Sequence, residues 1–250
     1  MTKDAEKIIQ AAPQKMQSML KSVYDYNIKF ILNEEQEKLL SRILFEMTKV
    51  DRKYFYEKEE EVYSDVALPI GKGQTISQPS TVARMLILAD IHEGEDVLEV
   101  GTGSGWNASL ISFLNYPGNT VSVERIYALI EKAEKNIAAL RSYLKQKHPQ
   151  DVNNLDKLNL YAENIFEKGR AWKKTYDKII LTAGIEKGKE EKVKKLAQKL
   201  LKKNGVMICP YTEGPILILK KIDGKLLEST TKEEYSFVPL LEKGVVKKEK

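Results

Sequence analysis

The stretch DVLEVGTGSGW, residues 96–106, joins a short apolar run to a glycine-rich turn and the start of a helix. In open α/β sheets the ligand binds at this point, where the first strand ends and the first helix begins. Glycines there allow the backbone to approach a ligand closely. The glycines follow the pattern G-x-G-x-G, and Trp106 stands where the third glycine of the dinucleotide motif G-x-G-x-x-G would fall. A P-loop ending of Gly-Lys-Ser or Gly-Lys-Thr is also missing, so we predict a nucleoside site without a pyrophosphate cradle.

Short apolar runs alternate with amphipathic helices after this stretch. The expected strands are residues 96–100, 120–124, 157–161 and 177–183. One helix is expected to begin near Trp106, and another follows the second strand. Residues 189–203 carry the i, i+3, i+4, i+7, i+8 stripe of a helix on a sheet, with Asn204-Gly205 as the expected stop signal. The repeated order strand, helix, strand predicts a parallel sheet that is covered on both faces.

The two ends of the chain have different patterns. Residues 1–50 place apolar side chains at helical spacing, and Asn33 followed by Gln36 resembles a capping box. Near the C-terminus three segments are strand-like with no helix between them: GVMICPY (205–211), PILILKKI (215–222) and EEYSFVPL (233–240). Asp223-Gly224 is a two-residue hairpin signal. We therefore predict an α/β fold with a doubly wound, mostly parallel sheet, an antiparallel C-terminal hairpin and a helical N-terminal extension.

The composition indicates a cytosolic protein with a mixed, solvated surface. Of the 250 residues, 41 are Lys or Arg and 36 are Asp or Glu, so the formal net charge is only +5. That balance is a weak argument for nucleic-acid binding, which usually needs basic residues clustered on one face. No apolar run approaches the roughly 18 residues of a membrane span, and we expect no membrane association. The single cysteine, Cys209, excludes an internal disulfide and is expected to lie buried in a strand.

Glu124 supports a nucleoside site. It ends the second expected strand, 23 residues after Gly101. At about that spacing a carboxylate can accept hydrogen bonds from both ribose hydroxyls. The simpler interpretation, a glycine turn and an unrelated surface glutamate, does not explain why the two features occur together at this distance.

A second unusual stretch, GKGQTISQP, covers residues 71–79. It is too polar for a core strand and too rich in glycine for a helix, and it offers two hydroxyls and an amide. One interpretation is that it holds an acceptor group. The other is that Ser77 only caps the following helix, with Pro79 in its first turn. Asp65 nearby either braces this loop or lies exposed in solvent.

These motifs together resemble a known family. DVLEVGTGSGW, the strand ending in Glu124 and the closing hairpin are similar to those of S-adenosylmethionine-dependent methyltransferases. More narrowly, VYSDVALPI (62–70), ALPIGKGQTISQP (67–79) and YSFVPL (235–240) resemble protein-L-isoaspartate O-methyltransferases. The similarity covers about residues 40–240. The glycine motif is shared by many methyltransferases, whereas GQTIS at this position is characteristic of the one family.

The resemblance implies an activity and a set of roles. The cofactor would be S-adenosyl-L-methionine, with S-adenosyl-L-homocysteine as its product, and the acceptor would be the free carboxylate of isoaspartyl residues in damaged peptides and proteins. The methyl ester collapses to a succinimide that hydrolyses partly to normal aspartate, so the enzyme repairs proteins. Ser77 would lie beside the reacting methyl, with Thr75, Ile76 and Gln78 shaping the acceptor pocket. The implied cofactor-binding residues are Glu99, Gly101, Thr102, Gly103, Ser104, Gly105, Glu124, Arg125, Glu163 and Asn164.

Within that set the glycines would contact the methionine and ribose portions, Glu124 the ribose, and Glu163 with Asn164 the adenine side. We expect no metal site. The predicted organisation is a helical extension (1–50), an acceptor loop with its lead-in helix (51–95), a cofactor-binding α/β domain (96–242) and a mobile tail (243–250).

The chemistry agrees with the residues present. A free carboxyl has a pKa of roughly 4, so the acceptor is already ionised at neutral pH and needs no general base. The chain has only two histidines, His92 and His148, and neither stands in a catalytic motif.

Departures from the family pattern leave the acceptor open. Ala162-Glu163-Asn164 replaces a Gly-Asp-Gly turn, and GIEKGKEEK (184–192) replaces a run of small residues. One alternative is a methyltransferase acting on RNA or a small molecule. Enzymes that methylate bases commonly have a proline- and aromatic-rich turn after the fourth strand, whereas this chain has LTAG (181–184). The other alternative is a cofactor-binding interaction module that works through its N-terminal helices. The oligomeric state stays open.

Overall fold

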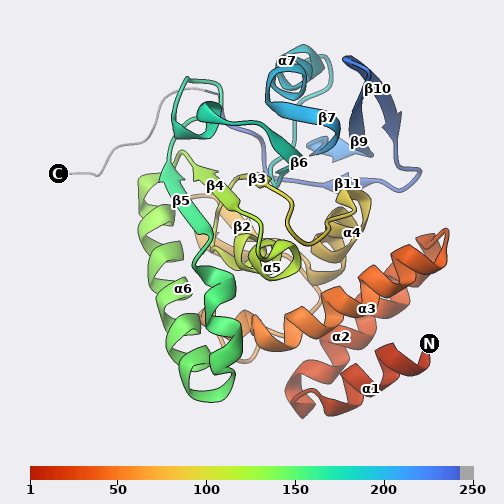
Figure 1. Cartoon of the computed structure of the whole chain (residues 1–250). Coiled ribbons are helices and arrows are strands. Elements are labelled where there is room, and N and C mark those ends of the chain that lie inside the picture. The colour runs from red at the N-terminus through yellow and green to blue at the C-terminus, as the bar shows by residue number, and fades with distance from the viewer. Residues whose placement is uncertain (243–250) are drawn as a thin grey trace.

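The computed structural model describes residues 1–242, and the predicted mobile tail at 243–250 lies outside the described residues. Within this part of the chain the main sheet has seven strands in the order β10-β9-β7-β6-β3-β4-β5 (Figure 1). In chain order these are β3 (Val97–Val100), β4 (Thr120–Glu124), β5 (Leu158–Ala162), β6 (Tyr176–Leu181), β7 (Leu201–Pro210), β9 (Ile216–Ile222) and β10 (Lys225–Thr230). The first five run parallel, whereas β9 is antiparallel to both β7 and β10. The predicted sheet with its antiparallel closing hairpin is therefore confirmed.

Helices cover both faces of the sheet, as the sequence predicts. The helices α4 (Pro79–Ala89), α5 (Trp106–Asn115) and α6 (Tyr127–Lys147) share one hydrophobic core with the N-terminal helices. The helix α7 (Glu190–Leu200) packs on the opposite face, where β3, β6 and β7 contribute to a second core. Alternate residues of β3 enter the two cores: Val97 faces the first and Leu98 the second. This alternation follows from the two-residue period of a strand that is buried on both faces.

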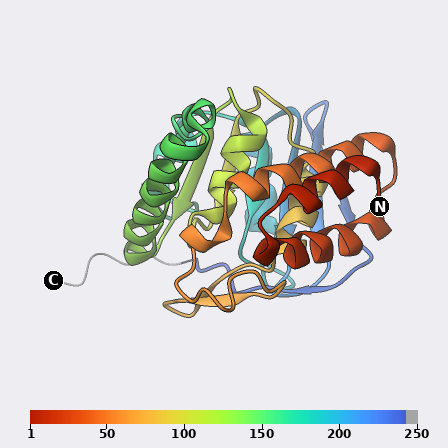
Figure 2. The ribbon, with the colours of Figure 1, turned by 90° about the horizontal axis from the view of Figure 1, so that it is seen from below.

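The N-terminal extension forms a further helical layer. It contains α1 (Lys3–Ala11), α2 (Gln14–Asn27), the short 3-10 helix η1 (Ile28–Phe30) and α3 (Glu34–Lys49). Figure 2 shows these helices, in red to orange, beside α4 and α5. The predicted cap is present, because Asn33 Oδ1 accepts a hydrogen bond from Gln36 N at 2.9 Å. Asn27 of α2 donates to the Ser80 carbonyl of α4 at 3.0 Å, which ties this layer to the start of α4.

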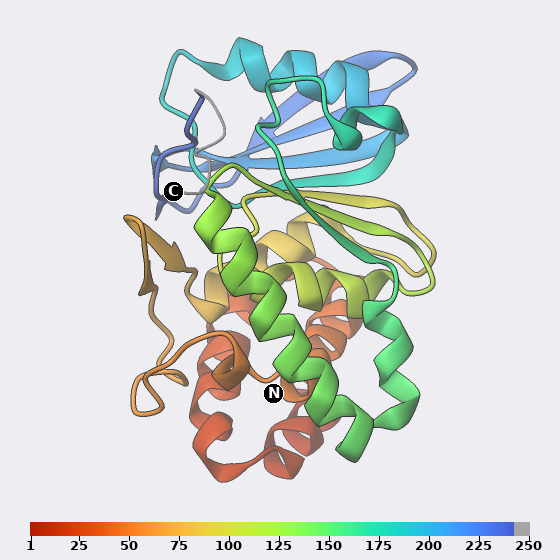
Figure 3. The same cartoon turned by 90° about the vertical axis from the view of Figure 1, so that its left-hand side faces the viewer.

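Two small antiparallel sheets lie apart from the main one. The strands β1 (Leu68–Gly71) and β2 (Gln74–Ile76) form a hairpin, and β8 (Glu213–Gly214) pairs with β11 (Tyr235–Ser236). Only two residues of the strand expected at 233–240 are therefore in a strand. Figure 3 shows the β1–β2 hairpin and the C-terminal segment on the same side of the molecule. The remaining short elements are the 3-10 helices η2 (Arg52–Tyr54), η3 (Pro149–Leu155) and η4 (Arg170–Lys173).

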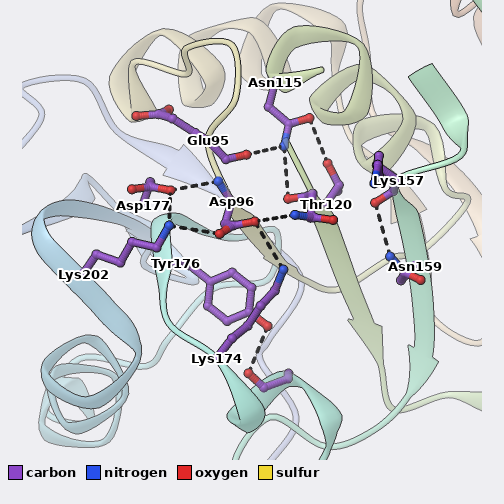
Figure 4. A network of polar contacts seen from close by, with 12 residues as sticks. Glu95, Asp96, Asn115, Thr120, Lys157, Asn159, Lys174, Tyr176, Asp177 and Lys202 are labelled. Atoms are coloured by element: carbon purple, nitrogen blue, oxygen red, sulfur yellow. Dashed lines mark hydrogen bonds and ion pairs between the residues drawn. The ribbon is translucent and has the colours of Figure 1, made fainter. Parts of the chain in front are cut away.

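A polar network joins the beginnings of the central strands (Figure 4). The Asp96 N–H donates to Asp177 Oδ2 at 2.8 Å, and Lys202 Nζ contacts the carboxylates of both residues at 2.9 and 2.8 Å. Asn119 and Lys174 also donate to Asp96. Burial alone would raise the pKa of Asp96, but the hydrogen bonds from Asn119, Lys202 and Lys174 outweigh it and lower the pKa. The network holds β3, β6 and β7 at their amino ends, so their carboxyl ends are left for a site.

Cys209 is buried in β7, as predicted, and burial raises the pKa of its thiol. Among residues 1–242 no helix is both long enough and apolar enough to cross a membrane.

Candidate active site

The glycine motif turns sharply away from the sheet directly after β3. Gly101, Gly103 and Gly105 have φ angles of +106°, +53° and +87°, which residues with a side chain rarely adopt. A Cβ atom on Gly101 would lie only 2.3 Å from Thr182 Oγ1, at the end of the neighbouring strand β6. A Cβ atom on Gly105 would meet Ala133 of α6 at 3.2 Å. Gly101 therefore allows the turn to pack directly against the end of β6, whereas Gly105 allows α5 and α6 to pack closely.

Glu124 lies at the end of β4, directly beside the glycine turn. Its side chain accepts hydrogen bonds from the backbone N–H groups of Gly103 at 3.2 Å and Ile126 at 2.9 Å. Burial raises the pKa of Glu124, although these backbone bonds oppose the rise. A carboxylate has about four lone-pair sites, and the backbone N–H groups of Ile126, Gly103 and Arg125 use three of them, so acceptor capacity is left for a ligand hydroxyl. The carboxylate is thus fixed in place and still able to accept from a diol.

Two adjoining hollows form one continuous cleft along the carboxyl ends of the strands. The hollows measure about 430 and 500 Å³, including their open mouths. Gln74, Gly101, Glu124 and Ala183 line both. The first hollow is also lined by Arg125, Ile126, Glu163, Asn164, Ile165 and Leu241, and the second by Thr75, Ile76, Ser77, Thr102, Gly103, Ser104, Asn107 and Thr182. The structure therefore brings most of the predicted site residues together, from segments far apart in the sequence.

Glu99 lies behind the glycine turn and does not line the cleft. Its carboxyl group is fully buried and accepts hydrogen bonds from Ser122 Oγ and from Asn107 Nδ2, the latter at 2.8 Å. Ser122 in turn pairs with Thr102 Oγ1 at 2.6 Å. Burial raises the pKa of Glu99 to about 8. Any influence of Glu99 on a ligand is therefore exerted through Asn107 and Thr102, which do line the cleft.

Replacing Glu99 by glutamine is expected to stabilise the protein increasingly as the pH rises. The folded pKa of about 8 lies above the unfolded value of 4.5, so folding must retain a proton that the unfolded chain releases. The Glu99 contribution is thus most favourable below pH 4.5 and is lost between pH 4.5 and about 8, by at most about 1.4 kcal/mol per pH unit. Urea unfolding of Glu99→Gln and of the parent chain across this range measures the difference.

The Asp96→Asn variant is the matched control. Because the pKa of Asp96 is lowered, its carboxylate stabilises the fold above the unfolded pKa, and that stabilisation is lost as the pH falls. A stability difference for Glu99→Gln that does not change with pH would contradict a protonated Glu99.

Glu163 and Asn164 line the first hollow but also hold neighbouring backbone. The Glu163 carboxylate accepts from the N–H groups of Arg170 at 2.9 Å and Ala171 at 3.3 Å, at the start of η4. Asn164 Nδ2 donates to the carbonyl of Glu242 at 3.0 Å. These two residues therefore shape the adenine side of the predicted site partly by placing η4 and the C-terminal segment.

The C-terminal segment is a part of the site that sequence reasoning missed. Gly184 N donates to the Val238 carbonyl at 2.8 Å, and Leu240 N donates back to the Gly184 carbonyl at 2.7 Å. Val238 lines the second hollow, while Pro239, Leu240 and Leu241 line the first. The motif YSFVPL marked this segment as part of the resemblance, but nothing in it indicated a wall of the cleft.

Ser77 lies directly after β2, between the cleft and a larger open hollow of about 1200 Å³. Both spaces are lined by Thr75, Ser77, Thr182 and Val238. Gln78 lines only the larger hollow, which also contacts Tyr26 of α2 and Tyr235 of β11. Within the described chain, Ser77 is therefore placed where a group that enters from the larger hollow would meet a ligand bound in the cleft.

The helix α4 is capped by Asp65 and not by Ser77. Its N-cap position is Gln78, which makes no capping bond with its own side chain. Asp65 Oδ1 instead accepts a hydrogen bond from Ser80 N at 2.8 Å, and Gln78 Nε2 donates to Asp65 at 3.3 Å. The capping interpretation of Ser77 is thus wrong, and Asp65 braces the loop.

The cleft fits S-adenosylmethionine. The Glu124 carboxylate suits a ribose diol, and the apolar side chains of Ile126 and Ile165 in the first hollow suit an adenine ring. Beside the second hollow Asn107 Oδ1 is buried and has no hydrogen-bond partner among residues 1–242, so an acceptor is available there for an ammonium group. Such unfilled buried acceptors are uncommon in folded proteins.

Comparisons with known proteins agree with this site. The family model "Protein-L-isoaspartate(D-aspartate) O-methyltransferase (PCMT)" matches residues 27–245. A protein-L-isoaspartate O-methyltransferase of Ignicoccus hospitalis is 36% identical over 204 residues, covering 78% of this chain and 87% of the relative. The protein of the same name from Pyrococcus horikoshii is 36% identical over 200 residues, covering 77% of this chain and 81% of that one.

The fold is shared with a solved structure. A crystal structure from Plasmodium falciparum, described as a protein-L-isoaspartate O-methyltransferase in complex with S-adenosyl-L-homocysteine, superposes with a TM-score of 0.70 at 20% identity. The match covers 92% of this chain and 100% of the other. With the matching family model and relatives, these findings show that the chain belongs to the protein-L-isoaspartate(D-aspartate) O-methyltransferase family, with the fold of class I S-adenosylmethionine-dependent methyltransferases.

Proposed function

We propose that this protein transfers a methyl group from S-adenosylmethionine to the free carboxylate of isoaspartyl residues in damaged proteins, and that Ser77 orients that carboxylate. The position of Ser77, on the boundary between the nucleoside cleft and the larger hollow, carries the proposal. The acceptor peptide would lie in the larger hollow and extend its carboxylate past Ser77. Thr75, Ile76 and Gln78 would shape this passage.

The residues on the acceptor side suit methylation of a carboxylate. The cofactor supplies a methyl group made electrophilic by the adjoining sulfonium. The hydroxyls of Ser77 and Thr75 can orient a carboxylate by hydrogen bonds without the full positive charge of a lysine, which would reduce its nucleophilicity. With cofactor and acceptor bound, the β1–β2 hairpin and the C-terminal segment, which line the cleft and the larger hollow, would exclude water from the point of transfer. Alignment and desolvation therefore supply most of the acceleration.

The cofactor contacts follow the division of the cleft. Glu124 would accept from the ribose hydroxyls, and Arg125, Glu163 and Asn164 would border the adenine. The turn from Gly101 to Ser104 would contact the methionine portion, while Glu99 and Gly105 support that turn from behind. On the same grounds residues 51–95 form the acceptor loop with its lead-in helix, and residues 96–242 the cofactor-binding domain.

A peptide acceptor is favoured over a nucleic acid. The turn after β6 has Thr182 Oγ1 donating to the carbonyl of Gly101 at 2.7 Å, and its residues 181–184 contain no aromatic side chain on which a base could stack. A single buried cysteine is consistent with a reducing, cytoplasmic setting for this repair.

Transfer of labelled methyl to an isoaspartyl peptide and to its normal aspartyl twin tests the proposal. Base-labile label is expected on the isoaspartyl peptide alone. Ser77→Ala is expected to lower kcat/KM roughly 10- to 150-fold, the value of one hydrogen bond to a charged group. Ser142→Ala, which removes an exposed hydroxyl on α6, is the control and should have no effect.

Equal labelling of both peptides would overturn the isoaspartyl specificity. No label on either peptide, with S-adenosylhomocysteine still bound, would assign the cleft to another acceptor.

A further inference from the structure

Arg52 is a buried cation that lies in the predicted acceptor segment (51–95) but is not among the predicted site residues. It belongs to η2, its side chain is fully buried, and burial lowers its pKa to about 9 although Asp65 opposes the shift. Its Nε has no hydrogen-bond partner within residues 1–242. Burying a guanidinium is costly unless its donors are used, so the contacts that it does make call for an explanation.

The two terminal guanidinium nitrogens of Arg52 bridge the two ends of the β1–β2 hairpin. One donates to the Ser77 carbonyl at 2.8 Å and the other to the Val66 carbonyl at 3.2 Å. Val66 lies two residues before β1, and Ser77 is the first residue after β2. A single planar side chain therefore closes the base of the hairpin that carries Thr75 and Ile76.

The same guanidinium rests on the helix that follows the glycine motif. Its central carbon lies 4.6 Å from the ring centroid of Trp106, the first residue of α5. Trp106 is itself buried and donates from its indole nitrogen to the Val50 carbonyl at 2.9 Å, so the ring cannot turn away. Arginine over an indole is a favourable cation–π arrangement, and it strengthens when water is excluded.

We propose that Arg52 is a positioning residue, which sets the Ser77 segment against the glycine turn through its stack on Trp106. The inference rests on the proposed function, because it holds that Arg52 fixes the position of the acceptor side of the site relative to the cofactor side. A lysine cannot replace it, since one ammonium cannot reach both carbonyls in a plane and also stack on the indole. Asp65 fixes the chain just after Ser77 as well, because its carboxylate accepts a hydrogen bond from Ser80 N.

Kinetics and ligand binding of Arg52→Lys and Arg52→Met test the proposal. We expect kcat for the isoaspartyl peptide to fall about tenfold in Arg52→Lys and about a hundredfold in Arg52→Met, since misplacement by about 1 Å has effects of that size. The S-adenosylhomocysteine Kd, measured by calorimetry, and the peptide KM are expected to change less than about threefold. Arg42→Met is the matched control, because Arg42 also donates to a backbone carbonyl, that of Leu114, but lies on α3 away from the cleft.

Chemical rescue separates positioning from general support of the fold. Guanidinium at low millimolar concentration is expected to restore activity to Arg52→Ala at least about fivefold, since it can occupy the vacated space between the two carbonyls and the indole. Equal concentrations of urea or sodium chloride should not. A loss of activity that disappears at saturating cofactor would overturn the proposal, as would full activity in Arg52→Met or the same loss in Arg42→Met.

Amide hydrogen exchange gives a readout that does not depend on the acceptor. In Arg52→Met residues 66–77 are expected to lose protection while residues 96–106 keep theirs. If the parent chain methylates no isoaspartyl peptide, the proposed function fails, and this exchange pattern still decides whether Arg52 holds the hairpin. Unchanged protection of residues 66–77 would overturn the role of Arg52.

Discussion

Gly101→Ala is expected to weaken S-adenosylhomocysteine binding more than about a hundredfold, equal to about 2.7 kcal/mol. The new Cβ atom would lie 2.3 Å from Thr182 Oγ1, which is held in place because it donates to the carbonyls of Val100 and Gly101. The φ angle of +106° is also unfavourable for alanine. Either the glycine turn or the end of β6 must move, and both line the cleft. We expect unfolding stability to fall by roughly 2–5 kcal/mol. Calorimetry and urea unfolding measure the two effects.

Two further variants separate the collision from the backbone strain. Gly94 has a similar φ of +81° but has open space around its Cβ position, so Gly94→Ala should cost about 1–2 kcal/mol of stability and leave cofactor binding intact. The double variant Gly101→Ala with Thr182→Ala removes the colliding oxygen and should regain part of the affinity. Wild-type affinity in Gly101→Ala, or an equal loss in Gly94→Ala, would show that the close approach at Gly101 is unimportant.

Glu124→Ala is expected to produce a loss of cofactor affinity of the same order. Two charge-assisted hydrogen bonds to ribose hydroxyls are worth about 1.5–3 kcal/mol each, which together correspond to a loss of roughly 10² to 10⁴-fold. The variant also leaves the N–H groups of Gly103 and Ile126 without the acceptor that they have in the parent chain. Glu124→Gln restores the size of the side chain, but it turns one acceptor oxygen into a donor that faces an N–H group, so it should recover little.

Comparison of S-adenosylhomocysteine with its 2′-deoxy analogue shows whether Glu124 contacts the ribose. The parent chain is expected to prefer the ribose form clearly, whereas Glu124→Ala should bind both forms with similar, weak affinity. Asp151→Ala is the control, because it removes an equally buried carboxylate that does not line the cleft. Asp151 Oδ1 pairs with Lys49 Nζ at a distance of 3.1 Å, and its loss should leave the preference for ribose unchanged. A preference for ribose that persists in Glu124→Ala would contradict the proposed contact.

Several elements deviate from the sequence prediction for physical reasons. The helix expected at 189–203 ends at Leu200, because β7 begins at Leu201 beside Tyr176 and the register with β6 shifts before Val206. Asn204-Gly205 therefore marks an irregularity inside the strand and not the end of a helix. Local propensity could not distinguish a helix end from an irregularity within a strand, since pairing with a neighbouring strand decides where the helix must stop.

The local sequence was sufficient to predict the sheet, the glycine turn and the position of Glu124 at the end of its strand. Apolar periodicity determines which faces are buried, and G-x-G-x-G permits backbone angles that other residues avoid, so these features depend on neighbours in sequence. Tertiary structure alone decided that Glu99 lies behind the cleft, that Asp65 caps α4, that residues 238–241 wall the site and that Arg52 bridges Val66 and Ser77. Each of these depends on contacts between segments distant in sequence, where the partner of a polar group is chosen by proximity in the folded chain.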